Sequence, residues 1–102
     1  MFLLANFVWA LAGVIDMVLT IYMWIVIIRA FVSWVNPDPY NPIVRFLYSV
    51  TEPVLYRLRR AMPFIYTGGI DFSPLVVIVA IYFLKAFLVQ SLYDLARTIR
   101  MG

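Results

Sequence analysis

Three charged residues lie inside stretches of the chain that are otherwise apolar, and they are the first candidates for chemistry. Asp16 and Arg29 interrupt an apolar run over residues 2–34, and Lys85 interrupts a second run over residues 75–92. A charge at the middle of a bilayer is unfavourable by roughly 2.5 to 3.5 kcal/mol on the insertion scale, so each charge needs a partner or a function. We therefore treat all three as candidate functional or structural residues.

The spacing of these charges predicts an ion pair between the two apolar runs. With a rise of about 1.5 Å per residue, Asp16 lies roughly 20 Å along a helix from Arg29, and Lys85 lies roughly 16 Å from Pro74. Two helices that run in opposite directions would place Asp16 and Lys85 at similar depths. The polar and small residues of the first run also share one side of a helix with Asp16: Asn6, Gly13 and Thr20. We predict that Asp16 pairs with Lys85.

Arg29 points away from that side, and its predicted partner is Asp71 or Glu52, near the other end of the membrane. Two other interpretations stay open. Arg29 and Lys85 would extend to the headgroups while Asp16 is protonated, or the charges would line an ion or proton pathway.

Composition excludes several classes of function. Hydrophobic residues make up 66% of the 102 residues and charged residues 13%, far from the pattern of soluble domains. Neither cysteine nor histidine occurs, which removes disulfides, thiolate or imidazole metal sites and nucleophilic dyads of these residues. The acids Asp38, Glu52 and Asp71 would bind a metal only if they converged in space. We predict that the protein is not an enzyme, with no catalytic, cofactor or metal site.

The pattern predicts a single all-α membrane domain over residues 1–102, with two antiparallel transmembrane helices. The first is expected at about 3–34, the linker at 35–73 and the second helix at about 74–93. The segment from Ala10 to Ala12 resembles a signal-peptide cleavage site. No Lys or Arg precedes it and the apolar run continues past it, so a retained helix is the favoured interpretation.

The linker carries signals for one or two short interfacial or re-entrant helices. Asn41 is a predicted N-cap, with Pro42 at the first helical position. The triplet from Thr51 to Pro53 repeats that signal and predicts a second start. Pro63 is expected to end the second helix, and the glycine pair 68–69 to form a turn. We expect the arginines of the second helix to bind anionic headgroups, with an acidic protein surface as the alternative: Arg57, Arg59 and Arg60.

The basic residues also predict an orientation. Four arginines lie in the linker and two in the tail after residue 93, which favours a cytoplasmic linker: Arg45, Arg57, Arg59 and Arg60 against Arg97 and Arg100. The net charge of +3 suits an anionic lipid surface or an acidic partner. Without a basic surface interleaved with aromatic residues, direct binding of nucleic acid is not expected.

The linker motifs resemble those of the YggT family, also called YlmG. The resemblance rests on Trp34-Val-Asn-Pro-Asp-Pro-Tyr-Asn-Pro-Ile-Val-Arg-Phe-Leu-Tyr48, Thr51-Glu-Pro53, Arg59-Arg60, Pro63 and Gly69-Ile-Asp-Phe-Ser-Pro74, across roughly residues 25–92. Arg57 is a departure, since many members have proline there. The positions that match the family pattern are Arg29, Asn36, Pro37, Asp38, Pro39, Asn41, Pro42, Arg45, Thr51, Glu52, Pro53, Arg59, Arg60, Gly69, Asp71, Ser73 and Pro74.

The resemblance implies a multi-pass protein of the bacterial plasma membrane in the single-copy form, and it does not imply a catalytic site. It also implies a link to cell division, the envelope or osmotic tolerance. Our leading hypothesis is a non-enzymatic protein that supports a membrane-associated assembly, with the linker as its docking surface for a cell-division or envelope partner. The alternative is a homo-oligomer that forms an ion channel or transporter, lined by Asp16 and Lys85.

Overall fold

The computed structural model describes residues 1–35, 38, 40–67 and 70–101, and within residues 65–67 and 70–71 it describes the backbone alone. The chain divides into two compact units. The terminal unit contains Met1–Ile21 and Ala80–Gly102, and the linker unit contains Tyr22–Val79. The candidate residues fall into both units, so each unit is described separately below.

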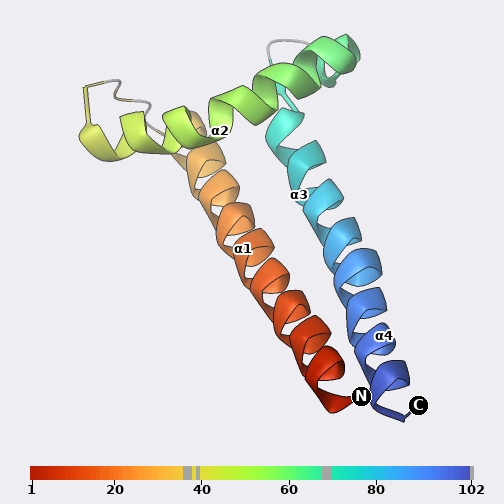
Figure 1. Cartoon of the computed structure of the whole chain (residues 1–102). Coiled ribbons are helices and arrows are strands. Elements are labelled where there is room, and N and C mark those ends of the chain that lie inside the picture. Colours follow the sequence, from red (N-terminus) through yellow and green to blue (C-terminus); the bar gives the residue numbers. More distant parts are fainter. Residues whose placement is uncertain (36–37, 39, 68–69, 102) are drawn as a thin grey trace. The chain divides into compact units, whose positions relative to one another are not determined.

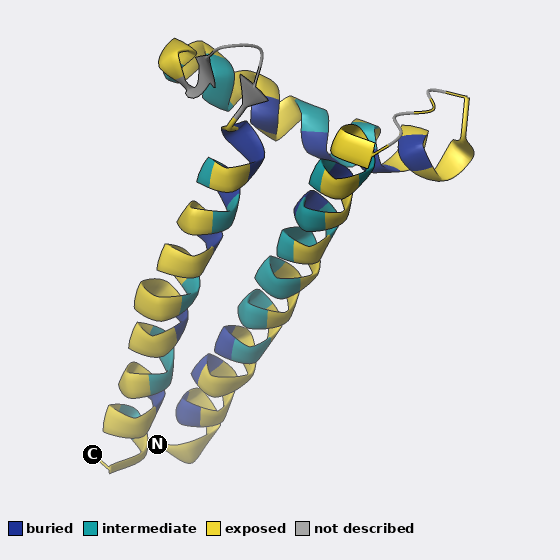
Figure 2. Cartoon of the chain, turned by 180° about the vertical axis from the view of Figure 1, so that it is seen from behind, coloured by how far each residue is buried: buried dark blue, intermediate teal, exposed yellow. Residues whose placement is uncertain are grey.

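The first apolar run forms one helix, α1 (Phe2–Val35), close to the predicted bounds of 3–34. The second run forms a continuous helical segment from Ser73 to Met101. Both are long and apolar enough to cross a membrane, and 11% and 17% of the residues in their most apolar windows are buried. In Figure 2 most of the surface of these helices is exposed. A soluble protein would bury such helices in its core, so their exposed apolar surface is that of a membrane protein.

The linker contains a single long helix, α2 (Pro42–Ala61), which begins as predicted. The side chain of Asn41 accepts a hydrogen bond from the backbone N–H of Ile43 at 2.9 Å, and Pro42 occupies the first turn. Pro42 has no N–H to leave unpaired, and its fixed φ suits the start of a helix. The helix ends at Ala61, and Pro63 starts a short 3-10 helix, η1 (Pro63–Ile65).

The prediction of a second helix start at Thr51 to Pro53 is wrong, because α2 continues through Pro53. Proline inside a helix removes one backbone hydrogen bond and crowds the carbonyl four residues earlier. Two hydrogen bonds, one within α2 and one from α1, support the helix beside this proline. The Thr51 hydroxyl donates to the carbonyl of Leu47 at 2.7 Å, and the Tyr22 hydroxyl on α1 donates to the carbonyl of Val50 at 3.2 Å.

After η1, two strands of two residues each form an antiparallel pair, with Tyr66 opposite Asp71 and Thr67 opposite Ile70. These are β1 (Tyr66–Thr67) and β2 (Ile70–Asp71), and no strand pattern had indicated them. The predicted turn at Gly68–Gly69 lies outside the described residues. The all-α fold class is confirmed, since every other described element is a helix.

The second apolar helix has three parts: α3 (Ser73–Leu84), the π-helix η2 (Lys85–Val89) and α4 (Gln90–Met101). Pro74 lies in the first turn, as predicted. The helix continues to Met101, beyond the predicted exit near residue 93, and the leucines, alanine, arginines and methionine of this end are good helix formers. The π-helix had no signal in the sequence. It starts at the one lysine of the chain.

Each unit has a small core. In the terminal unit, alanines let the two helices approach closely: Ala5 and Ala12 on α1 and Ala96 on α4 are at most 1% exposed. In the linker unit, α2 buries one side in contact with the ends of α1 and α3: Val44, Leu47, Thr51 and Leu55. Figure 1 shows α2 lying across the last turns of α1 and the first turns of α3. This packing positions the polar residues of the linker.

Candidate functional site

A carboxylate held between two arginines is the central polar feature of the linker unit. Arg29 Nη2, on α1, lies 2.7 Å from Oε2 of Glu52 on α2. Arg59 Nη1, two turns further along α2, lies 2.7 Å from Oε1 of the same carboxylate. Both contacts are charge-assisted hydrogen bonds of the strong, short kind. The predicted partnership of Arg29 with Glu52 is confirmed, and Arg59 is an additional partner.

Arg29 is held on a second side by an aromatic ring. Its guanidinium carbon lies 4.6 Å from the centre of the Tyr48 ring. Tyr48, Glu52 and Arg59 lie four and seven residues apart, which places them on one side of α2. The Arg29 side chain is 8% exposed, and its Nε has no hydrogen-bond partner among the described residues. A buried guanidinium therefore depends on Glu52 for its compensation.

Two guanidinium groups share the Glu52 carboxylate. The side chains of Arg59 and Glu52 are 26% and 44% exposed, so these two face outward more than Arg29 does. Together the contacts connect the last turns of α1 to the middle of α2. The arrangement is suited to holding α2 in one position relative to the end of α1.

The other arginines of α2 remain on its outer surface. Arg45, Ser49, Tyr56 and Arg60 are exposed and recur at spacings of four, seven and four residues, which places them on one side of the helix. We call these four residues the outer Arg face. The Arg60 guanidinium lies 5.8 Å from the Tyr56 ring centre. Exposed apolar residues occupy a different side of α2, with Ile43 at 69% and Phe46 at 59% exposure.

The turn before α2 is held by local hydrogen bonds. Asp38 Oδ1 accepts from the backbone N–H of Tyr40 at 3.1 Å, and the Asp38 carbonyl accepts from the N–H of Asn41 at 3.2 Å. Asp38 thus acts in the turn, a common role for aspartate. Its neighbour Asn36 was a candidate and lies outside the described residues.

The predicted pair of Asp16 and Lys85 is present in the terminal unit. Lys85 Nζ lies 3.5 Å from Asp16 Oδ1 and donates a shorter hydrogen bond, of 2.7 Å, to Thr20 Oγ1. Thr20 belonged to the predicted polar side of α1. Its part in holding Lys85 had not been predicted, although Thr20 lies one helical turn beyond Asp16 and its hydroxyl can accept.

Further contacts of the terminal unit follow the same two helices. The rings of Trp9 and Tyr93 lie 4.5 Å apart, and Arg100 Nη2 donates to Asn6 Oδ1 at 2.9 Å. The N-terminal amine donates to the carbonyl of Ile99 at 3.5 Å. Sequence analysis did not predict these contacts.

Apart from the turn residues before α2, the candidate residues from the sequence divide into three groups. The structure brings Arg29, Glu52 and Arg59 together, and it separately brings Asp16 to Lys85. Arg45 and Arg60 are exposed and belong to neither cluster. Gly69 lies outside the described residues, and Asp71 is described only as backbone in β2. Among the described residues, no three acidic side chains lie close enough to hold a metal ion.

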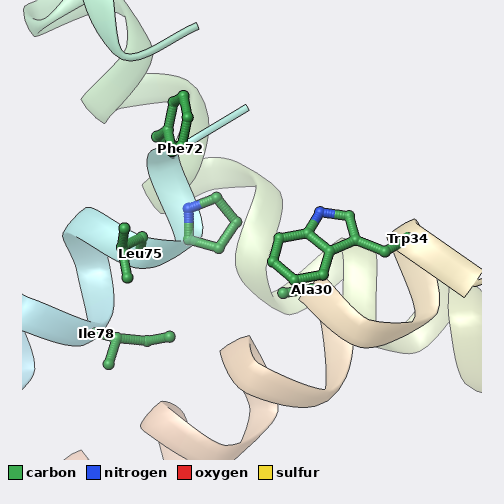
Figure 3. Close-up of a pocket in the computed structure, with 6 residues that line it drawn as sticks. Ala30, Trp34, Phe72, Leu75 and Ile78 are labelled. Carbon is green, nitrogen blue, oxygen red and sulfur yellow. The ribbon is translucent and has the colours of Figure 1, made fainter. Parts of the chain in front are cut away.

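The linker unit also contains a small apolar cavity (Figure 3). Its volume is about 140 Å³, and it lies between the end of α1 and the start of α3: Ala30, Trp34, Phe72, Pro74, Leu75 and Ile78 line it. No charged residue is among these, so the cavity offers no polar chemistry. The polar cluster at Glu52 is the stronger candidate.

Comparison with known proteins assigns the family. The CCB3/YggT family model matches residues 8–92, which contain most of both apolar helices and the whole of α2. The chain belongs to the CCB3/YggT family. An uncharacterized protein of Pseudomonas aeruginosa is 28% identical over 89% of the chain and 45% of its own length. The uncharacterized protein YggT of Escherichia coli strain K12 is 33% identical over 74% of the chain and 39% of its own length.

A third relative, an uncharacterized protein of Haemophilus influenzae, is 38% identical over 68% of the chain and 36% of its own length. The chain thus spans less than half the length of these curated relatives. No solved structure matches it. Family membership and the two long apolar helices together indicate a membrane protein.

Proposed function

We propose that this member of the CCB3/YggT family is a non-enzymatic docking protein of the bacterial plasma membrane. In this proposal α1 and the helix over 73–101 cross the bilayer in opposite directions. The linker helix α2 lies at the membrane surface and presents the outer Arg face to an acidic partner. The observation that carries the proposal is the double contact of Glu52, which holds α2 against α1 through Arg29 and Arg59.

The proposal follows from how α2 divides its surface. One side is buried against the ends of the spans, and a second side carries exposed Ile43 and Phe46, which suit the acyl boundary of a bilayer. The outer Arg face contains no acid of its own. Because Glu52 already neutralises part of the charge of Arg29 and Arg59, Arg45 and Arg60 are the arginines that the outer Arg face offers to an external acid, while Arg57 is exposed outside that face.

The same contacts distinguish docking from simple anchoring. A helix that only anchored in headgroups would need no fixed position, since lipids adapt to it. A protein surface must be held in place to match a partner, and charge pairs favour orientation and specificity. A rigid connection between α2 and α1 therefore supports a protein partner. Assemblies of cell division or of the envelope, and those that act in osmotic tolerance, are the contexts in which we would look for it first.

The direct test is co-purification from membranes with a charge-reversed outer face. Arg45→Glu with Arg60→Glu should remove the partner that the native protein recovers, because both guanidinium groups become repulsive. Arg57→Glu with Arg97→Glu is the matched control, since it changes the net charge equally at exposed residues outside the face. Equal recovery of the same proteins by both variants and by the native chain would refute the docking role.

We further propose that the linker faces the cytoplasm, because four arginines lie there and two lie in α4. A reporter fused after Gly102 tests this orientation. A reporter enzyme that works only outside the cytoplasm should be active at this position, and one that works only in the cytoplasm should be inactive. A reporter that works in the cytoplasm at the same position would reverse the orientation.

A further inference from the structure

The cluster of Asp16, Thr20 and Lys85 lies deep within both apolar helices. Asp16 is about 21 Å from the start of α1 and about 28 Å from its end. Lys85 is about 18 Å from the start of α3 and about 24 Å from the end of α4. The hydrocarbon core of a bilayer is about 30 Å thick, so a helix that crosses it with either residue near its centre places that charge among the acyl chains.

The chain itself leaves this cluster partly uncovered. The Asp16 side chain is 41% exposed and the Lys85 side chain is 30% exposed. Arg29, by contrast, is only 8% exposed where the chain provides it with a carboxylate and a ring. Charged groups inside a membrane face protein or a water-filled cavity, since hydrocarbon cannot solvate them. The exposed parts of Asp16 and Lys85 therefore need a further protein surface or a water-filled cavity beside them.

The side of α1 that carries the cluster is unlike its other exposed sides. Asn6, Trp9, Asp16 and Thr20 recur at helical spacing and each contacts the second helix through a polar group or a ring. Trp9 is nevertheless 46% exposed. Level with the cluster, the other exposed side chains of the same helix are apolar, as a lipid-facing surface should be: Val14, Met17, Val18 and Ile21.

We propose that this side of the terminal unit binds a second copy of the chain, with Asp16 of each copy facing Lys85 of the other. Each copy carries one acid and one base at the same depth. A two-fold axis along the membrane normal keeps both copies at the same depth. It places Asp16 of each copy beside Lys85 of the other, so the surface is complementary to itself. A different partner would need a matching acid and base of its own at this depth.

The irregular helix beside the cluster agrees with this assignment. Lys85 is the first residue of the π-helix η2, where the turn widens by one residue. Such bulges are frequent at functional sites in helices. A lipid headgroup is the wrong ligand for the cluster, because headgroup phosphates remain at the membrane surface. The proposed dimer does not depend on the docking role of α2, which involves the other unit.

The test uses complementary charge reversals in two populations of the full-length protein. Asp16→Lys places two cations in every copy, and Lys85→Asp places two anions in every copy. Each variant alone should lose at least tenfold in self-association, measured by energy transfer between labelled copies in lipid vesicles. Co-expression of the two variants should restore association, since the mixed dimer pairs opposite charges only between copies. The double variant Asp16→Lys with Lys85→Asp should associate with itself and serves as the folding control.

Two results would overturn the proposal. One is a native protein that shows no energy transfer at any protein-to-lipid ratio. The other is a double variant that folds and associates while the co-expressed single variants do not, since that result would assign the charge pair to a contact within one copy. Neither result bears on the outer Arg face, so a failure of the dimer and a failure of the docking role are distinguishable.

Discussion

Arg29 and Glu52 form a 2.7 Å hydrogen bond across 23 positions of sequence, from the last turns of α1 to the middle of α2. The other carboxylate oxygen of Glu52 accepts a hydrogen bond of the same length from Arg59. A single carboxylate thereby compensates a buried guanidinium and fixes the direction of the linker helix.

Loss of the Glu52 carboxylate should destabilise the linker unit. Glu52→Gln keeps the size of the side chain but leaves the buried Arg29 charge without compensation. Because Glu52 is 44% exposed, we expect a loss of about 2 kcal/mol rather than the larger cost of a fully buried pair. Thermal unfolding in detergent measures it. Arg59→Gln is the matched control and should cost about 1 kcal/mol or less, since Arg59 is more exposed.

Replacement of Pro53 should show whether α2 is one helix. Pro53→Ala restores a backbone donor inside a continuous helix and removes a steric conflict, so it should stabilise the protein by about 1 kcal/mol or more. The midpoint of unfolding of the variant tests this. A clear loss of stability would instead mean that Pro53 starts a separate helix.

The Tyr22 hydroxyl should contribute to the same continuity. Its hydrogen bond to the Val50 carbonyl is 3.2 Å long and lies beside Pro53. Tyr22→Phe removes the donor while keeping the ring, and we expect a loss of about 1 kcal/mol. Additivity with Pro53→Ala is informative: if the hydroxyl compensates for the proline, the loss caused by Tyr22→Phe should be smaller in the Pro53→Ala background. An unchanged loss would show that the two are independent.

Gly13 should accept a small side chain and reject a large one. A Cβ at this position would lie 3.6 Å from the Tyr93 hydroxyl, which is an ordinary contact distance. Gly13→Ala should therefore be neutral or stabilising by up to about 1 kcal/mol, because alanine favours the helix. Gly13→Leu should separate Trp9 from Tyr93 and shift the tryptophan fluorescence. Destabilisation by alanine equal to that by leucine would contradict the packing.

The features that follow local rules were predictable from sequence. Hydropathy located both apolar helices, and the pairing of Asn41 with Pro42 located the start of α2. The rise of a helix was enough to place Asp16 opposite Lys85. Arg29 and Glu52 were also a predicted partnership, because a buried cation needs an acid and the sequence offers few acids.

Features that depend on contacts between distant segments were not predictable. The triplet ending at Pro53 is a valid start signal in isolation, but in the structure Tyr22 on α1 supports the helix through it. Arg59 was expected at the headgroups and instead binds Glu52, a partner seven residues earlier. The π-helix at Lys85 had no local signal, and its proximity to Asp16 and Thr20 is visible only in three dimensions.

Site-specific photocrosslinking in living cells tests whether α2 presents the outer Arg face to a protein. A photoreactive residue at Ser49, between Arg45 and Arg60 on that face, should give a discrete crosslinked product. The product should disappear with Arg45→Glu and Arg60→Glu and persist with Arg57→Glu and Arg97→Glu. The same residue at Ile43, on the apolar side, should give none. The same products from both positions, or a Ser49 product insensitive to charge reversal, would contradict the account.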